Sequence, residues 1–160
     1  MGKILSRDAL KQVIDRLKRE GRKIAFTNGC FDILHVGHVR YLREAGKMGD
    51  VLVLALNSDA SVRAIKGEKR PLVPENERAD VVAALEFIDY VTIFDELTPL
   101  ELIEYLQPDV IIKGGDWTEE NVVGRDAVKR WGGRVAIIPE IPGASTTNIV
   151  EKIMKVYGEP

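Results

Sequence analysis

Apolar stretches of strand length alternate with amphipathic stretches of helical period along almost the whole chain. The run VLVLAL at residues 51–56 is apolar at every position, which is typical of a parallel strand covered on both faces. Because strands that alternate with helices form parallel sheets through right-handed crossovers, the pattern predicts an α/β fold with a doubly wound parallel sheet. The five predicted strands are residues 23–27, 51–56, 90–94, 110–113 and 134–139.

Helices are expected in the intervals between these strands. A leading helix within residues 1–21 carries Leu10, Val13, Ile14 and Leu17 on one stripe and follows Ser6, a suitable N-cap. A C-terminal helix is expected over residues 146–157, and the remaining predicted helices are residues 37–48, 75–87, 99–105 and 119–131.

The length and the linker pattern indicate one domain. The chain has 160 residues and neither an internal repeat nor an interdomain linker, so a single domain over residues 1–160 is expected. The polar segment at residues 63–76 predicts a mobile loop, and ligands of such folds bind at the carboxyl ends of the strands. That loop is therefore expected beside a binding site.

Charge and hydropathy exclude several classes of partner. The net charge is −2, from 23 Lys and Arg against 25 Asp and Glu, so no overall positive field draws the chain to nucleic acid or to an anionic membrane. No apolar run has the length of a membrane span or of a signal peptide, and a cytoplasmic protein is expected. Cys30 is the single cysteine, which agrees with a reducing compartment.

Both histidines of the chain lie directly after the first predicted core strand. The turn at residues 27–32, TNGCFD, contains Gly29, which permits a tight turn with backbone N–H groups facing an anion. His35 and His38 are three residues apart, so on the first turn of a helix their imidazoles share one face. Beside the partly positive helix N-terminus they could stabilise a phosphoryl group and its developing charge.

Two other interpretations of this histidine pair are a zinc site and simple packing or capping. Zinc takes about four ligands, and only Cys30 and Asp32 lie nearby in sequence, without CxxC or HExxH spacing. A lone histidine is usually structural, but here the only two share one glycine-spaced motif after a strand-end turn.

The sequence TNGCFDILHVGHVRYL at residues 27–42 resembles the first signature of the HxGH cytidylyltransferase-like nucleotidyltransferases. This is a Rossmann-like superfamily related to the class I aminoacyl-tRNA synthetases, and it implies the HUP-type nucleotidyltransferase fold. The resemblance covers nearly the whole chain, because further motifs follow in the family's order: Asn57-Ser58-Asp59, Lys66, Arg70-Pro71, Glu77-Arg78, the segment KGGDW at residues 113–117 and the segment GASTT at residues 143–147.

Within the superfamily the motifs are most similar to the adenylyltransferases that make ADP-heptose from heptose 1-phosphate. Glycerol-3-phosphate cytidylyltransferases share several of these motifs but carry a charged RTEGIS stretch. Here the corresponding residues 139–144 read PEIPGA and lack the arginine, which weakens the cytidylyltransferase interpretation.

The resemblance implies that a phosphate oxygen of the acceptor sugar attacks the α-phosphorus of ATP in line and releases pyrophosphate. Mg²⁺ carried by the triphosphate would screen its charge, and no metal ligand of the protein is expected. Because such a transfer depends on positioning and charge stabilisation, donors and cations are the expected functional groups.

The site residues carried over from the family fall into three groups. Expected catalytic residues are His35, His38 and Lys66. Expected nucleotide-binding and phosphate-binding residues are Asn28, Gly29, Cys30, Phe31, Arg78, Lys113, Gly114, Gly115, Asp116, Ser145, Thr146 and Thr147. Expected substrate-binding residues are Asp32, Asn57, Asp59 and Trp117.

Several of these positions keep a structural alternative. Lys66 is either a lysine that closes on the phosphates or a solvated surface lysine. Arg78 either binds phosphate or orders the loop, or it forms an ion pair on a helix surface. The hydroxyls at residues 145–147 either bind phosphate or only cap the last helix. Trp117 is either a wall of the site or a core side chain.

Two other functions remain open at this stage. The first is a cytidylyltransferase that uses CTP with glycerol 3-phosphate or a similar alcohol phosphate. The second is a nucleotide-binding sensor without turnover. The expected partners are ATP and a sugar phosphate, and the resemblance further implies a homodimer and a separate sugar kinase in the same pathway.

Overall fold

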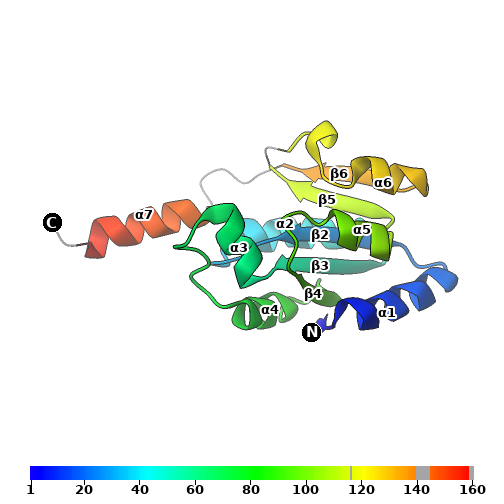
Figure 1. Cartoon of the computed structure of the whole chain (residues 1–160), viewed down its shortest axis with the longest axis horizontal. Helices are drawn as coiled ribbons and strands as arrows, with labels where there is room; N and C mark the ends of the chain where they lie inside the picture. The colour runs from blue at the N-terminus through cyan, green and yellow to red at the C-terminus, as the bar shows by residue number, and fades with distance from the viewer. Residues whose placement is uncertain (116, 140–144, 159–160) are drawn as a thin grey trace.

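A single parallel sheet organises the computed structural model, which describes residues 1–115, 117–139 and 145–158. Its strands run in the order β1-β4-β3-β2-β5-β6 (Figure 1). The sheet consists of β1 (Lys3–Ile4), β2 (Ile24–Gly29), β3 (Val51–Asn57), β4 (Tyr90–Phe94), β5 (Val110–Gly114) and β6 (Arg134–Ile138).

Helices connect these strands and cover both faces of the sheet. They are α1 (Arg7–Arg19), α2 (Val36–Gly46), α3 (Asp59–Lys66), α4 (Glu75–Ala83), α5 (Leu100–Leu106), the 3₁₀ turn η1 (Glu119–Asn121), α6 (Arg125–Arg130) and α7 (Thr146–Tyr157). Within the described ranges, none of the helices combines the length and the apolar character that a membrane crossing requires.

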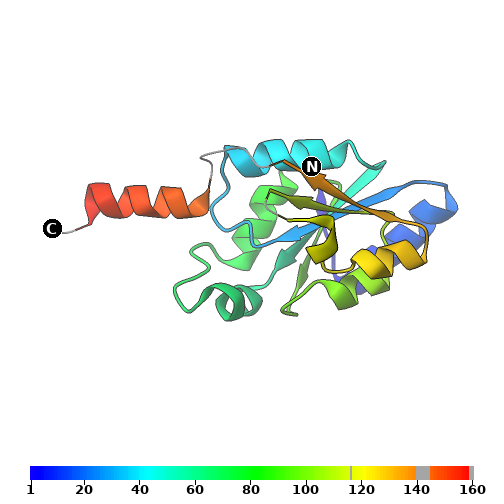
Figure 2. The same ribbon diagram turned by 90° about the horizontal axis from the view of Figure 1, so that it is seen from above.

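The core has two parts, one on each face of the sheet. Helices α1, α5 and α6 contribute Leu10, Ile103 and Val128 to one part, and α2 and α4 contribute Leu42 and Val82 to the other. Figure 2 shows α2 on the opposite side of the sheet from α5 and α6. The doubly wound α/β architecture predicted from the sequence is confirmed.

The sheet has six strands rather than the predicted five. The additional strand β1 pairs with β4 through Lys3 and Tyr90 and through Ile4 and Val91. A strand of two residues is too short to show a hydrophobic period, so the sequence pattern could not reveal it.

Two predicted segments differ from the structure. Helix α3, capped by Ser58, occupies the first part of residues 63–76, which were expected to be a loop throughout. Residues 119–131 were expected to form one helix but contain η1 and α6, separated near Gly124, which has a φ of +88°. A Cβ at Gly124 would lie 2.8 Å from the Ile103 side chain, so close packing on α5 fixes this break.

Helix α7 has no buried residue and extends away from the body of the sheet (Figures 1 and 2). Its N-cap is Ser145, whose hydroxyl accepts a hydrogen bond from the backbone of Asn148 at 3.0 Å. Ser6 caps α1 in the same way, as predicted, by accepting from the backbone of Ala9.

An aspartate precedes each of the strands β3, β4 and β5 and joins it to its neighbour. The carboxylates of Asp50, Asp89 and Asp109 accept backbone hydrogen bonds from Lys23, Leu52 and Ile24 at 2.8, 2.8 and 2.7 Å. Each aspartate N–H donates back to the carbonyl of the same partner. These reciprocal pairs fix the register at the amino ends of the strands.

The substitution Asp89→Ala is expected to lower the free energy of unfolding by about 1–3 kcal/mol, because it leaves the Leu52 N–H without its acceptor. Urea denaturation of the variant and the wild-type protein measures the difference. The control is Asp126→Ala, whose side chain is 84% exposed and whose loss should change the stability by less than about 0.5 kcal/mol. Equal stability of both variants would contradict the role of Asp89.

Candidate active site

The site lies where strands β2 and β5 separate. Pairing between them ends at Thr27 and Ile112, whereas β2 stays paired with β3 as far as Gly29 and Leu56. The chain leaves β2 toward α2 on one face of the sheet and leaves β5 toward α6 on the other. This divergence is a topological switch point, where doubly wound folds bind their ligands.

Side chains join the two strands across this crevice. The Tyr41 hydroxyl lies 2.6 Å from the Thr27 hydroxyl and donates to the Ile112 carbonyl at 3.0 Å. Lys113 Nζ donates to the Asn28 carbonyl at 3.2 Å, at a position where the strands no longer pair. Burial raises the pKa of the Tyr41 hydroxyl, so it stays protonated and keeps donating.

The crevice opens into a pocket of about 750 Å³. Among the residues expected at the site, those that line the pocket are Asn28, Gly29, Cys30, Phe31, His35, His38, Lys66, Lys113, Gly114, Gly115, Trp117, Ser145 and Thr146. Asp116 and the segment 140–144 lie outside the described residues. The structure thus brings together side chains and backbone from segments as far apart in sequence as Asn28 and Thr146.

Sequence reasoning missed part of the lining. The additional residues are Gly37, Arg40, Tyr41, Arg43, Glu44, Ile138 and Pro139. Positions 37, 40, 41 and 44 recur at helical spacing after His35, so the period of the predicted helix was the signal that could have found them. Arg40, Arg43 and Glu44 add charge to the wall formed by α2.

The two imidazoles stack against each other at the start of α2. His35 is the N-cap residue, and its ring centroid lies 3.8 Å from that of His38 with an interplanar angle of 25°. The His35 backbone N–H donates to His38 Nδ1 at 3.4 Å, which leaves the proton of neutral His38 on Nε2. His38 therefore offers one N–H donor at the pocket.

Burial, with a smaller contribution from the neighbouring His35, lowers the pKa of His38 to about 4. The ring is therefore neutral at neutral pH in the free protein. A neutral donor next to a helix N-terminus accommodates an anion without a standing positive charge, and a bound phosphate would favour protonation.

The turn after β2 folds tightly over the pocket. Phe31 has a φ of +43°, a left-handed conformation that is unusual for a residue with a side chain. Its ring lies 5.1 Å from the His38 ring and covers Gly29, where a Cβ would come within 2.9 Å of the Phe31 ring. Burial raises the pKa of the adjacent Cys30 thiol, so this thiol is protonated at neutral pH.

Two lysines and the start of α7 supply further polar groups. Burial lowers the pKa of Lys113 to about 8, and its Nζ lies 5.4 Å from the centre of the Trp117 ring. Lys66 is the last residue of α3 and lines the pocket. The Thr146 hydroxyl donates to the Ile33 carbonyl at 3.4 Å, which ties α7 to the segment that leads to His35.

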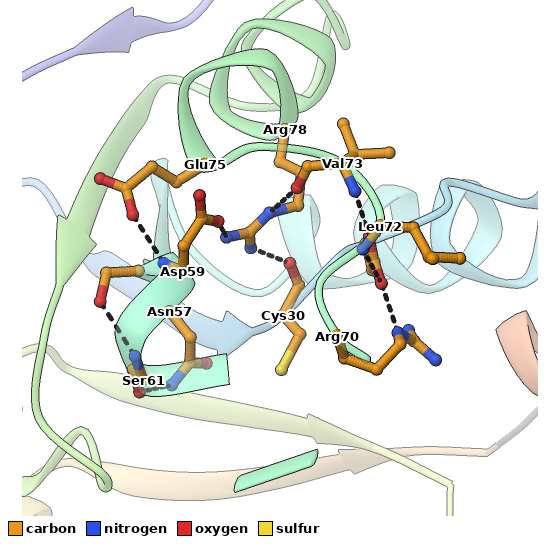
Figure 3. A network of polar contacts seen from close by, with 11 residues as sticks. Cys30, Asn57, Asp59, Ser61, Arg70, Leu72, Val73, Glu75 and Arg78 are labelled. Atoms are coloured by element: carbon orange, nitrogen blue, oxygen red, sulfur yellow. Dashed lines mark hydrogen bonds and ion pairs between the residues drawn. The ribbon is translucent and has the colours of Figure 1, made fainter. Parts of the chain in front are cut away.

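Five expected site residues do not line the pocket. Four of them, Asp32, Asn57, Asp59 and Arg78, make hydrogen bonds or ion pairs with other protein groups. Figure 3 shows Asn57, Asp59 and Arg78 in this network. The fifth, Thr147, lies in the first turn of α7. Arg78 does form an ion pair, with Asp59, but its side chain is fully buried, so this pair does not lie on a helix surface.

The sequence predicts no metal-binding residues in the protein itself. Across the part of the chain that the structure describes, no group of three His, Cys, Asp or Glu side chains is placed to hold a metal ion.

The low pKa of His38 predicts how stability depends on pH. Because the folded state lowers this pKa from 6.5 to about 4, the unfolded chain binds the proton more readily between these values. The free energy of unfolding should therefore fall as the pH drops from 6.5 to 4, by at most about 3 kcal/mol from this group.

An NMR titration of the imidazole C–H resonances measures the pKa, and urea denaturation between pH 7 and 4 measures the stability. His38→Gln should lose less stability than the wild-type protein over this range. A His38 midpoint near 6.5 would show that the ring is solvated and contradict the placement.

Comparison with known proteins gives consistent similarities. Residues 26–152 match the family described as Cytidylyltransferase-like. The chain is 61% identical over 157 residues to "Bifunctional protein HldE" of Geobacter metallireducens and 57% identical to the protein of the same name from Geobacter sulfurreducens. Each alignment covers 98% of this chain but 32% of the relative, so the chain spans about a third of the length of these curated relatives.

A solved structure shares the fold. The lipopolysaccharide core biosynthesis protein from Thermoplasma volcanium GSS1 superposes with a TM-score of 0.63 and is 29% identical. The match covers 76% of this chain and 98% of that protein.

Proposed function

This chain belongs to the cytidylyltransferase-like family of nucleotidyltransferases, and from that premise we propose that it transfers AMP from ATP to heptose 1-phosphate. The products would be ADP-heptose and pyrophosphate. The observation that carries the proposal is the stacked pair His35 and His38 at the N-terminus of α2, inside a pocket that also contains Lys66 and Lys113.

The pocket residues suit nucleotidyl transfer without a covalent enzyme intermediate. A phosphate oxygen of the acceptor attacks the α-phosphorus of ATP, the bond to that phosphorus forms, and the bond to the β-phosphate bridging oxygen breaks. The electron pair leaves with pyrophosphate. No nucleophile of the protein is required, so the protein acts by positioning and by stabilising charge.

His38 would donate its Nε2 proton in a hydrogen bond to the α-phosphate oxygens, where negative charge develops in the transition state. The backbone N–H groups of Val36 and Gly37 in the first turn of α2 lack partners inside the helix, and Gly37 lines the pocket, so they would add donors near these phosphates. Lys66 at the end of α3 and Lys113 near the end of β5 would neutralise charge on the remaining phosphates.

Mg²⁺ is the cofactor expected with a nucleoside triphosphate, whose charge it screens when bound. Because Mg²⁺ is usually bound by phosphate oxygens together with few protein ligands, the phosphates of the triphosphate would hold most of the ion's coordination sphere. The protein residues would then contact the phosphate oxygens that the ion leaves free.

Two comparisons support a nucleotidyltransferase role in heptose and lipopolysaccharide biosynthesis. The Geobacter relatives named HldE are up to 61% identical to this chain. The Thermoplasma protein, which is 29% identical, is described as a lipopolysaccharide core biosynthesis protein. The acceptor would arise from a kinase-type reaction, carried out by a kinase on the same or another polypeptide.

Pyrophosphate release tests the proposal, with ATP and CTP each combined with heptose 1-phosphate and glycerol 3-phosphate in the presence of Mg²⁺. We expect turnover with ATP and heptose 1-phosphate. His38→Ala should lower kcat by about a hundredfold to a thousandfold, because it removes a preorganised donor. Lys129→Ala, which removes an exposed lysine paired with Glu119, serves as the control and should keep full activity.

The other outcomes select other functions. A preference for CTP and glycerol 3-phosphate would identify a cytidylyltransferase. Tight nucleotide binding without pyrophosphate release from any pair would identify a sensor and overturn the proposed reaction.

The pKa of Lys113 predicts how ATP binding depends on pH. Deprotonation above a pKa of about 8 removes a positive charge from the pocket, so ATP affinity should fall by roughly tenfold between pH 7 and 9. The triphosphate is already ionised in this range, so its own titration does not cause the change.

Isothermal titration calorimetry at several pH values measures this dependence. Lys113→Met should bind ATP weakly at every pH, whereas Lys129→Met should retain the wild-type profile. An unchanged profile in Lys113→Met would show that Lys113 does not contact the phosphates.

A further inference from the structure

The strained turn at Phe31 is held from beneath by a buried arginine. Arg78 lies in α4, and its guanidinium donates to the Cys30 carbonyl at 2.5 Å, the Val73 carbonyl at 2.9 Å and the Asp59 carboxylate at 2.7 Å. Figure 3 shows the guanidinium directed at Cys30 and Asp59 from the side of α4. All of its nitrogens are therefore used within the protein, and its side chain is 0% exposed.

The bond to the Cys30 carbonyl determines the orientation of the next N–H group. In a trans peptide the carbonyl and the following N–H point in opposite directions. Since the Cys30 carbonyl points down to Arg78, the Phe31 N–H points away from Arg78, toward the pocket that Cys30 and Phe31 line. Arg78 thus aims a backbone donor at the pocket without reaching the pocket itself.

The same bond opposes a flip of this peptide. Phe31 has a φ of +43°, and a rotation of the Cys30–Phe31 peptide would let φ return to a negative value. Such strain persists only where the surrounding contacts outweigh it. The guanidinium is the charged group that holds the carbonyl in place and so maintains the strained form.

The other side of Phe31 is fixed by Asp32. Its carboxylate accepts backbone hydrogen bonds from Leu72 and Val73 at 2.9 Å and an ion pair from Arg70 at 2.5 Å. Burial alone would raise the pKa of Asp32, but these bonds together hold it below its usual value. Val73 is shared, because its N–H binds Asp32 and its carbonyl binds Arg78.

We propose that Arg78 is a positioning residue that orients the Phe31 N–H as a donor to phosphate oxygens in the pocket. The proposal rests on the proposed function in that the bound molecule carries phosphates. It makes the turn after β2 an anion hole whose shape depends on α4, an element that contributes no residue to the pocket lining in the described structure. Asp32 supports the same turn through the segment that follows Arg70.

The test uses the full chain labelled with ¹⁵N and inorganic pyrophosphate as the probe. In the wild-type protein, the Phe31 amide resonance should shift as pyrophosphate saturates the pocket. In Arg78→Met, the shift should disappear and the affinity for pyrophosphate should fall by about tenfold or more, because one donor is lost from the anion hole. Asp59 is 26% exposed, so water can solvate its carboxylate in this variant.

The control is Arg7→Met, which removes the ion pair with Glu96 at a site outside the pocket. This variant shows what the loss of a partly buried arginine does by itself. The Phe31 amide shift and the affinity for pyrophosphate should both stay unchanged. Should Arg78→Met fail to fold, Arg78→Lys carries the test, because lysine keeps the charge but cannot serve three acceptors with a planar fork.

Two results would overturn the proposal. One is a wild-type Phe31 amide that does not respond to pyrophosphate, and the other is a folded Arg78 variant whose affinity and Phe31 response match the wild-type protein. Neither result depends on the acceptor sugar. A normal Phe31 response without turnover on any substrate pair would instead reject the proposed reaction and leave the role of Arg78 intact.

Discussion

Strand β2 stays paired with β3 for two residues beyond the end of its pairing with β5, and this difference creates the site. Beyond Thr27 and Ile112 the backbone groups that face the gap have no strand partner. Tyr41 and Lys113 satisfy part of them with side-chain donors. The remaining space receives the turn at residues 28–32 and the start of α2, so that backbone N–H groups and side chains from distant segments meet at one strand edge.

The pocket combines a neutral hydrogen-bond donor with a positively charged one. His38 has a pKa of about 4 and is neutral at neutral pH, whereas Lys113, with a pKa of about 8, is mostly protonated. Burial is the main cause of both low values. An anion entering this pocket would find oriented dipoles together with positive charge, and its binding would raise both pKa values because the charged forms gain a partner.

Beneath the pocket, a second layer of polar contacts joins the turn after β2 to α3 and α4. Arg78 reaches the Cys30 carbonyl, the Val73 carbonyl and Asp59 at once. Because these three acceptors belong to separate segments of the chain, the strained conformation of Phe31 depends on contacts between those segments. A local change in α4 would therefore reach the pocket through the orientation of one peptide.

The sequence by itself determined the α/β class, most strands and the cluster around His35 and His38, because hydrophobic period and local motif spacing are visible along the chain. It could not show the two-residue strand β1 or the split between η1 and α6, since pairing and packing between distant segments decide these. Helix α3 has local signals, Ser58 as N-cap and Gly67 as C-cap, that could have revealed it within the polar segment. From their residue types and motifs, Asp32 and Asp59 are predicted to bind the substrate and Arg78 to bind phosphate. Only the tertiary structure placed them beneath the pocket, because the direction of a side chain depends on neighbours that no local pattern encodes.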